Sequence, residues 1–317
     1  MLRNFFIIAS ELRKWRLVVD VRVERICKYV CGNTFISMKL EHTSHIINSG
    51  DRRLLVPDLS VLSILDKEVS ELTMERRIFA HRGLNRVAPE NTLAAFEKTA
   101  DAGLTWIETD VDILGDGTPI VIHDTSLDRT TNRRGSYYGL EKSDLASIDA
   151  GAWFSPEFVG QPLPTLEQLI ELLNRRGLNA NIEIKSNEAG GAMSMRLIDS
   201  ILDALTGLDP EREVFFSSFN HVLLAKIKER APQYEVGCLY ETVALYDDWK
   251  SMLELVGASY IHPEDRGLTK SKVEAFREAG FGVNVWTVNS IDRAHELFNW
   301  GATGVFTDVA DSFAHLQ

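Results

Sequence analysis

Strand-like and helix-like segments alternate along this chain from residue 78 to residue 307. The strand-like segments are 78–80, 107–113, 119–123, 181–185, 214–217, 236–239, 260–262, 282–286 and 304–307. Strands that alternate with helices usually become parallel strands joined by right-handed crossovers. The link from residue 113 to residue 119 is too short for such a crossover, so residues 119–123 are expected to form the return arm of a hairpin.

Eight strands remain when that arm is set aside, and they favour one architecture. Residues 74–317 come close to the length of a (β/α)8 barrel, about 250 residues. We therefore predict an α/β fold, a (β/α)8 TIM barrel, with a small insertion over residues 125–163 after the hairpin. A doubly wound open sheet is the alternative, but its glycine-rich phosphate fingerprint is missing after the first strand.

Charge and composition limit the possible partners. The net charge is −12, and residues 1–73 hold 11 basic and 9 acidic residues, so residues 74–317 carry −12 − 2 = −14. An acidic body argues against nucleic acid as a partner, although a small phosphate ester held by a metal remains compatible with it.

No run approaches the roughly 20 apolar residues of a membrane span, and no secretory signal is present. We predict a cytoplasmic protein without stable membrane anchoring.

The three cysteines and the first 73 residues carry little functional information. Cys27, Cys31 and Cys238 match neither a disulfide framework nor a zinc pattern, and Cys238 is expected to be a small core residue. Residues 1–73 show no sustained period, whereas Met74 directly precedes the first barrel strand. We interpret residues 1–73 as an extension that is non-native or poorly ordered, and residues 74–317 as the barrel. A small regulatory or oligomerisation element is the competing interpretation.

Acidic residues alternate along the second strand. Glu108 and Asp110 point to one side of residues 107–113, as the period of a strand requires. Asp116-Gly117 is a strong signal for a two-residue turn, and this turn would place Asp110 opposite His123. The same pattern would also suit the wet face of an edge strand.

Further polar residues follow the other predicted strands. In a barrel of this kind, catalytic residues come from the carboxyl ends of several strands. The candidates at that rim are His81, Arg82, Glu90, Glu108, Asp110, His123, Glu183, Lys185, Trp286 and Asn289. Each has a structural alternative: Glu183 and Lys185 could form an ion pair, and His81 or Trp286 could lie in the core. The functional interpretation depends on their lying together.

The residue types at this rim suit one kind of chemistry. Three carboxylates form a hard-cation site suited to Mg²⁺ or Ca²⁺. Two histidines can divide the roles of general acid and general base. An arginine and a lysine can neutralise phosphate oxygens as charge develops. Together they predict metal-assisted cleavage of a phosphodiester.

Eight short motifs stand in the order of the glycerophosphodiester phosphodiesterases, which residues 76–308 resemble. They are His81-Arg82-Gly83, Pro89-Glu90-Asn91-Thr92, Glu108-Thr109-Asp110, His123-Asp124, Leu127-Asp128-Arg129-Thr130-Thr131, Pro164-Thr165-Leu166, Glu183-Ile184-Lys185 and Trp286-Thr287-Val288-Asn289. The resemblance, to the cytoplasmic bacterial type, implies a TIM-barrel enzyme that releases sn-glycerol 3-phosphate and an alcohol from a small glycerophosphodiester. Ala310, where the family often has proline, is a departure, and residues 1–73 have no counterpart in the pattern.

The resemblance also implies roles for individual residues. Glu108, Asp110 and Glu183 match the metal ligands, and His81 and His123 match the acid–base pair. Arg82 and Lys185 match phosphate contacts, Trp286 would pack on the glycerol carbons, and Glu90 belongs to the substrate-binding set. A glycerol hydroxyl would attack phosphorus to give a cyclic phosphate that water opens. Neither the choice between Mg²⁺ and Ca²⁺ nor the division of roles between the histidines follows from the sequence.

Two other functions fit the same residues. A phospholipase D-like lipid phosphodiesterase could use this barrel, and a basic or aromatic rim would be expected of it. A non-catalytic glycerophosphodiester-binding protein would be expected to lack a histidine or a metal ligand, and none is missing here. The preferred alcohol and the oligomeric state are open.

Overall fold

The computed structural model describes residues 16–20, 26–31, 34–39, 44–49, 52–57 and 76–317. The chain divides into two compact units, Met1–Met74 and Glu75–Gln317. Within the first unit, β1 (Arg16–Asp20), β2 (Ile26–Cys31) and β3 (Thr34–Lys39) form an antiparallel sheet, and β4 (Ser44–Ser49) pairs with β5 (Arg52–Pro57). The prediction that residues 1–73 are non-native or poorly ordered concerns a region that lies largely outside the described residues.

The second unit is a closed barrel of eight parallel strands, which confirms the predicted fold. Neighbouring strands pair all the way around, and the last strand pairs with the first. In order around the barrel, the strands are β6 (Arg77–His81), β7 (Trp106–Ile113), β9 (Asn179–Ile184), β10 (Val214–Ser218), β11 (Val236–Tyr240), β12 (Tyr260–Pro263), β13 (Gly282–Val285) and β14 (Gly304–Thr307).

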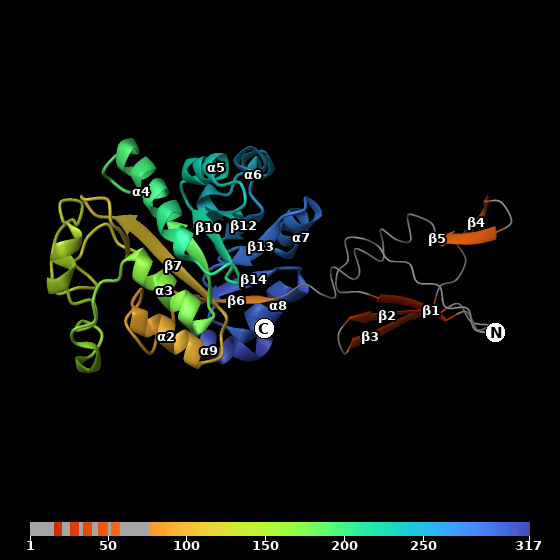
Figure 1. The fold of residues 1–317 in the computed structure, drawn as a ribbon, viewed down its shortest axis with the longest axis horizontal. Helices are drawn as coiled ribbons and strands as arrows, with labels where there is room; N and C mark the ends of the chain where they lie inside the picture. The colour runs from red at the N-terminus through yellow and green to blue at the C-terminus, as the bar shows by residue number, and fades with distance from the viewer. Residues whose placement is uncertain (1–15, 21–25, 32–33, 40–43, 50–51, 58–75) are drawn as a thin grey trace. The chain divides into compact units, whose positions relative to one another are not determined.

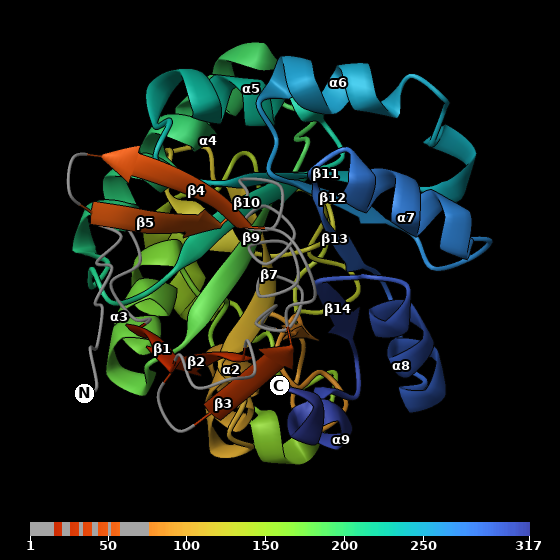
Figure 2. The ribbon, with the colours of Figure 1, turned by 90° about the vertical axis from the view of Figure 1, so that its right-hand side faces the viewer.

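Helices cover the outside of this barrel (Figures 1 and 2). They are α2 (Leu93–Asp101), α3 (Leu166–Arg176), α4 (Gly191–Ala204), α5 (His221–Arg230), α6 (Trp249–Val256), α7 (Lys270–Glu278), α8 (Ile291–Asn299) and the short α9 (Ala310–Phe313). Helix α3 begins with a capping box: the Thr165 hydroxyl accepts from the backbone N–H of Gln168, and the Gln168 side chain accepts from the backbone N–H of Thr165. Thr92 is the N-cap of α2, and its hydroxyl accepts from the backbone N–H of Ala95 (3.3 Å).

Apolar side chains fill the space on both sides of the strands. The main core lies between strands and helices and includes Cys238, which is fully buried as predicted. Inside the barrel, the aromatic rings of Phe79, Trp106, Phe215 and Phe306 pack together. His81 and Glu108 follow Phe79 and Trp106 by two residues on β6 and β7, so they lie on the same strand face, nearer the carboxyl ends.

The hairpin of β7 and β8 (Pro119–Val121) is real, but its predicted register is wrong by one residue. Val111 pairs with Val121, and the backbone N–H of Ile122 donates to the carbonyl of Asp110 (3.0 Å), so Asp110 lies opposite Ile122 and not His123. The turn holds three residues, because Gly117 has a positive φ (96°) but Asp116 does not, whereas a two-residue type I′ turn needs a positive φ at both positions.

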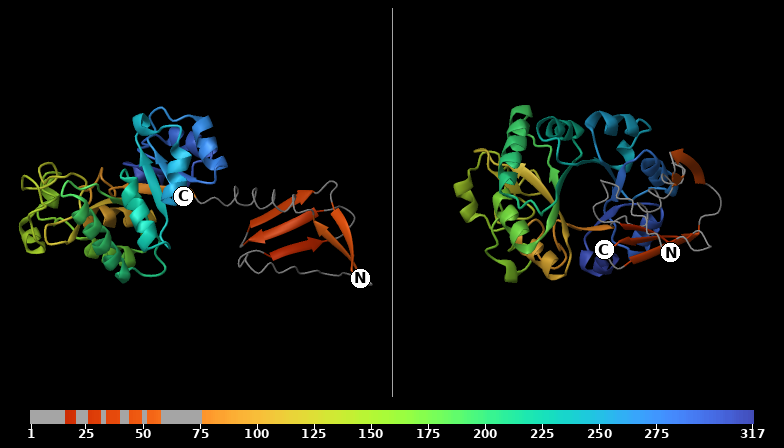
Figure 3. Two further views of the ribbon diagram at one scale, coloured as in Figure 1. Left: turned by 90° about the horizontal axis from the view of Figure 1, so that it is seen from above. Right: turned by 45° about the vertical axis from the view of Figure 1, so that its right-hand side comes forward.

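The insertion between β8 and α3 has a small core of its own. Its loops and 3₁₀ turns, η1 (Lys142–Ser147) and η2 (Pro156–Phe158), are the yellow and yellow-green segments in Figure 3. Leu127, Tyr137 and Leu163 pack there against Ile120 and Ile122 of the hairpin arm. The Tyr137 hydroxyl donates to the carboxylate of buried Asp112 on β7 (2.7 Å), and this contact joins the insertion to the barrel.

Candidate active site

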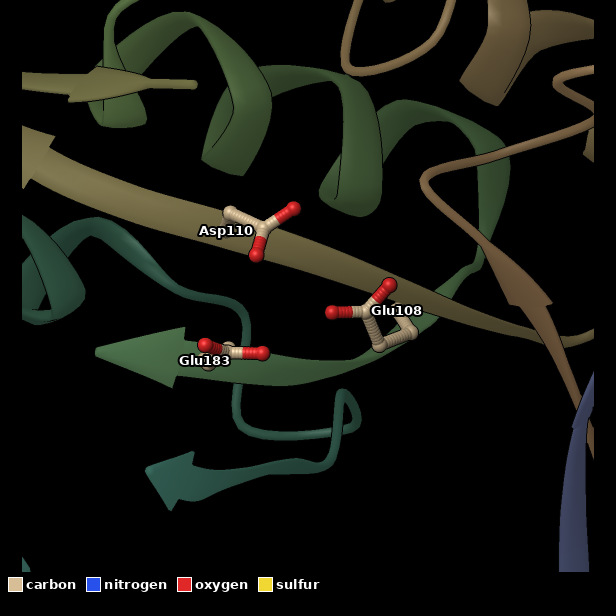
Figure 4. A group of neighbouring side chains, drawn as sticks. All are labelled: Glu108, Asp110 and Glu183. Carbon is tan, nitrogen blue, oxygen red and sulfur yellow. The ribbon is translucent and has the colours of Figure 1, made fainter. Parts of the chain in front are cut away.

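Three carboxylates from two neighbouring strands meet at the carboxyl rim of the barrel (Figure 4). Glu108 and Asp110 are two residues apart on β7 and therefore share a face, and Asp110 is paired with Glu183 of β9. One oxygen atom of each lies within 4.8 Å of the others, and the three residues are 4%, 1% and 8% exposed. Three buried carboxylates this close together repel one another, so their negative charges must be balanced by nearby positive charges.

Two basic side chains supply part of that compensation. Nζ of Lys185 donates to Glu183 (2.8 Å) and to Asp110 (3.3 Å). The backbone N–H of Arg82 donates to Glu108 (3.0 Å), and its Nε lies 3.4 Å from an oxygen of Asp110. Thus both candidate phosphate contacts, Arg82 and Lys185, lie directly against the carboxylates.

The pKa values of the carboxylates reflect this uneven compensation. Burial, together with the charge of Asp110, raises the pKa of Glu108 to about 8. The same two causes raise the pKa of Glu183. Burial alone would raise the pKa of Asp110, but the charges of Lys185 and Arg82 outweigh it and lower that pKa. A cation among the three would favour the anionic form of each.

Backbone conformations that ordinary residues rarely adopt shape this corner of the site. Arg82 and Asn91 both have left-handed backbones, with φ of 56° and 55°. The backbone N–H of Asn91 donates to the carbonyl of Arg82 (3.0 Å), and its side-chain amide donates to Asp110 (2.8 Å). Such conformations persist only where the surroundings hold them, and here they bring an arginine and an amide onto the carboxylates.

His81 is the last residue of β6. It is held by Asp308, an aspartate near the C-terminal end of the chain. Its Nδ1 lies 2.7 Å from an oxygen of Asp308, and its Nε2 lies 3.9 Å from Glu108. Asp308 also accepts hydrogen bonds from the side-chain amides of Asn85 (2.7 Å) and Asn289 (2.8 Å). Burial lowers the pKa of His81, but the hydrogen bond to Asp308 and the charge of Glu108 outweigh it, so the pKa is raised.

His123 lies beyond the end of β8 and is held by the residue that follows it. Its Nδ1 lies 2.7 Å from an oxygen of Asp124, whose carboxylate also accepts from Arg129 at 2.7 and 2.9 Å. Burial lowers the pKa of His123. The charge of Asp110 opposes this, but the positive charges of Lys185 and Arg82 lower the pKa further, so it stays below the usual histidine value. In both histidines Nδ1 is occupied by a carboxylate, so Nε2 is the nitrogen left for chemistry.

The remaining predicted residues lie around this centre. Glu90 accepts from Nη1 of Arg82 (2.8 Å) and from two nitrogens of Arg129, so its carboxylate holds arginines. Trp286 is half-buried after β13; its indole N–H donates to the carbonyl of His262 (2.8 Å), and its ring meets Phe219 edge-on at 5.5 Å.

The sequence predicted no active-site role for Asp308, Arg129 or Asn91, although all three lie within the predicted motifs or next to them. One signal was available for Asp308, because it directly follows the last strand, and in a closed barrel the last strand neighbours the first. No comparable signal exists for Arg129, because the path of the insertion follows no strand or helix period.

A comparison with known protein families assigns this chain to one of them. The family model for the glycerophosphoryl diester phosphodiesterase family matches residues 81–312. The chain belongs to this family. It is a phosphoric diester hydrolase, and the site residues described above, from His81 to Asp308, lie within the matched range.

Individual relatives agree with this assignment. The glycerophosphodiester phosphodiesterase of Caldanaerobacter subterraneus subsp. tengcongensis is 32% identical over 77% of this chain and 98% of its own length. That of Bacillus subtilis is 34% identical over 82% of this chain and 95% of its own. A phosphodiesterase of Oleispira antarctica, solved with its product sn-glycerol 3-phosphate, is 29% identical over 78% of this chain and 99% of its own, with a TM-score of 0.72.

Of the helices that the structure describes, none has both the length and the apolar character needed to cross a bilayer.

Proposed function

We propose that this enzyme hydrolyses small glycerophosphodiesters to sn-glycerol 3-phosphate and an alcohol, with a divalent cation on Glu108, Asp110 and Glu183 and with His81 and His123 as the acid–base pair. The observation that supports this most strongly is the buried carboxylate triad flanked by two histidines, a lysine and an arginine at one barrel rim. The product seen on the Oleispira antarctica relative supports the choice of substrate.

The donor set fits a hard divalent cation. The triad consists only of carboxylate oxygens, which Mg²⁺ and Ca²⁺ prefer, and the described part of the chain brings no cysteine or histidine into it. Burial and the charge of Asp110 raise the pKa values of Glu108 and Glu183, and a bound cation would offset both effects. When bound, the cation would supply positive charge that favours ionisation of a glycerol hydroxyl and offsets charge on the phosphate.

The side chains of this chain would perform the remaining tasks. Arg82 and Lys185 bind phosphate oxygens, while the Trp286 ring packs on the glycerol carbons. One histidine removes the proton of the attacking glycerol hydroxyl, and the other donates a proton to the leaving alcohol. The resulting cyclic phosphate is then opened by water with the roles reversed.

A monoacyl glycerophospholipid is a second candidate substrate, because one feature beside the site is apolar. A groove runs between α5 and α6, and Ser186, which follows Lys185, is among its lining residues. The side chains of Phe219, Val222, Met252 and Leu255 line it and are 43%, 65%, 40% and 80% exposed. A lipid phosphodiesterase could accommodate an acyl chain there.

The test is release of sn-glycerol 3-phosphate from glycerophosphocholine, with and without EDTA, by the full chain and by a chain that starts at Met74. We expect EDTA-sensitive release from both, restored by Mg²⁺ or Ca²⁺ and lost in His123→Ala. Equal activity of the shorter chain would support the proposal that residues 74–317 are the catalytic domain. Cleavage of lysophosphatidylcholine alone would favour the lipid enzyme, and binding without cleavage would favour the non-catalytic protein.

A further inference from the structure

A continuous chain of ion pairs joins His123 to Arg82, and Arg129 is its middle link. Nε and Nη2 of Arg129 donate to the two oxygens of Asp124 (2.7 and 2.9 Å), and Asp124 in turn holds Nδ1 of His123 (2.7 Å). Nη1 and Nη2 of the same guanidinium donate to the two oxygens of Glu90 (2.7 and 2.8 Å). Glu90 also accepts from Arg82 (2.8 Å).

This double bridge requires an arginine. A guanidinium carries five N–H donors in a planar fork, and the hydrogen bonds of Arg129 use four of them. Each carboxylate is therefore held at both oxygens, an arrangement that the single ammonium group of lysine does not reproduce. The charges of Glu90 and Asp124 are balanced by those of Arg82 and Arg129, so His123 faces a neutralised aspartate.

The backbone that carries Arg129 is itself held in place. The Thr131 hydroxyl donates to the carbonyl of Leu127 (2.7 Å), and Leu127 is buried in the core of the insertion. One oxygen of Asp128 accepts from the backbone N–H of Gly135 (3.1 Å). The residues on either side of Arg129 thus form a closed turn, which presents its side chain to the rim.

We propose that Arg129 is a positioning residue for the reaction, acting through Asp124 on His123 and through Glu90 on Arg82. This inference rests on the proposed function. By fixing the Asp124 carboxylate, Arg129 keeps the proton of neutral His123 on Nδ1 and leaves Nε2 free for proton transfer. By fixing Glu90, it keeps the Arg82 guanidinium directed at the carboxylate triad. The insertion thereby becomes part of the active site.

The first test is kinetic and uses glycerophosphocholine with saturating Mg²⁺. Arg129→Ala should lower kcat roughly 10–100-fold, the usual effect of losing a residue that orients a catalytic group. Arg134→Ala is the matched control, because Arg134 is an exposed arginine of the same segment, and its kcat should stay at the wild-type value. Arg129→Lys tests the fork, and we expect it to restore thermal stability but not kcat.

Double variants separate the link from Arg129 through Asp124 to His123 from the link through Glu90 to Arg82. The effect of Arg129→Ala on kcat should disappear in an Asp124→Ala background, because the path to His123 is already broken there. Its effect on KM, expected because Arg82 is proposed to bind phosphate, should disappear in a Glu90→Ala background, because the path to Arg82 is broken there. Full additivity in both backgrounds, or a kcat for Arg129→Ala equal to that of Arg134→Ala, would overturn the proposal.

The second test needs no activity and therefore separates this inference from the proposed substrate. Ring ¹⁵N shifts of His123, assigned by their absence in His123→Ala, should report the Nδ1–H tautomer in the wild type. In Arg129→Ala they should move toward the Nε2–H form, while Arg134→Ala stays at wild-type values. This result in a chain that cleaves no glycerophosphodiester would support the positioning role and contradict the proposed function. Unchanged His123 shifts in an Arg129→Ala enzyme that still cleaves glycerophosphocholine would support the proposed function and contradict the positioning role.

Discussion

The two histidines of this site are held by the same kind of partner in different electrostatic settings. Asp308, which holds His81, receives its other hydrogen bonds from the neutral amides of Asn85 and Asn289. Asp124, which holds His123, shares its carboxylate with a guanidinium. Asp308 keeps its full charge toward its histidine, and the pKa of His81 is raised while that of His123 is lowered.

This difference teaches how one fold can produce an acid and a base from one residue type. The orienting hydrogen bond is the same in both cases, at 2.7 Å, so it does not separate the histidines. The charges that face each ring separate them: Asp308 and Glu108 raise the pKa of His81, whereas Lys185 and Arg82 lower that of His123. His81 is then suited to hold a proton near neutral pH, and His123 is suited to accept one.

Removing either histidine should have the largest effect. His81→Ala and His123→Ala are each expected to lower kcat about 10²–10⁴-fold, the usual contribution of a general acid or base. His295→Ala, which removes an exposed histidine of α8, is the control and should leave kcat unchanged. If only one of the two variants lost activity, the two-histidine division of labour would be wrong.

The carboxylate of Asp308 should matter next. Asp308→Ala removes the partner of His81 Nδ1 and leaves two amide donors unpaired, so we expect kcat to fall roughly 10–100-fold. Steady-state kinetics measures the effect, and Asp311→Ala on α9 serves as an exposed aspartate control. Wild-type kcat in Asp308→Ala would mean that His81 needs no orienting partner.

The pH dependence of kcat/KM should show both histidines. His123 must be neutral to accept a proton, and its lowered pKa places the acid limb below the ordinary histidine value. His81 must be protonated to donate, and its raised pKa places the basic limb above that value. Asp308→Asn removes an anion that raises the pKa of His81, so its basic limb should move to lower pH while the acid limb stays. A shift of the acid limb instead would reverse the assignment.

The contact between the insertion and the barrel should have the smallest effect on catalysis. Tyr137→Phe removes a buried hydroxyl that donates to Asp112, and the free energy of unfolding should fall by about 1–3 kcal/mol. We expect a kcat close to that of the wild type, because Asp112 keeps its hydrogen bond from Tyr138 (2.7 Å). Urea unfolding measures the change, with Tyr246→Phe, an exposed tyrosine, as the control. A large loss of kcat without loss of stability would assign Tyr137 to the site itself.

Much of this architecture was accessible from the sequence because it depends on periodicity. The alternation of Glu108 and Asp110 and the spacing of Glu183 and Lys185 follow from strand geometry, and barrel topology brings the strand ends together. The register of the hairpin was missed by one residue, because a glycine with positive φ can serve a two-residue or a three-residue turn equally well.

The partners of the histidines were harder to predict, for a different reason. Asp308 meets His81 across 227 residues, and only closure of the barrel makes them neighbours. Arg129 lies in a segment whose path is set by local turns and by a small core around Tyr137. Contacts of this kind depend on three-dimensional packing, for which the sequence carries no period.

The most direct test of the central claim is titration of Mg²⁺ and of Ca²⁺ into EDTA-treated enzyme by calorimetry, with activity on glycerophosphocholine measured on the same samples. We expect one cation per chain, binding lost in Glu183→Gln, and sn-glycerol 3-phosphate release that follows occupancy. Full activity in the treated enzyme without added cation, or wild-type binding and activity in Glu183→Gln, would contradict the assignment of the carboxylate triad as the metal site of this phosphodiesterase.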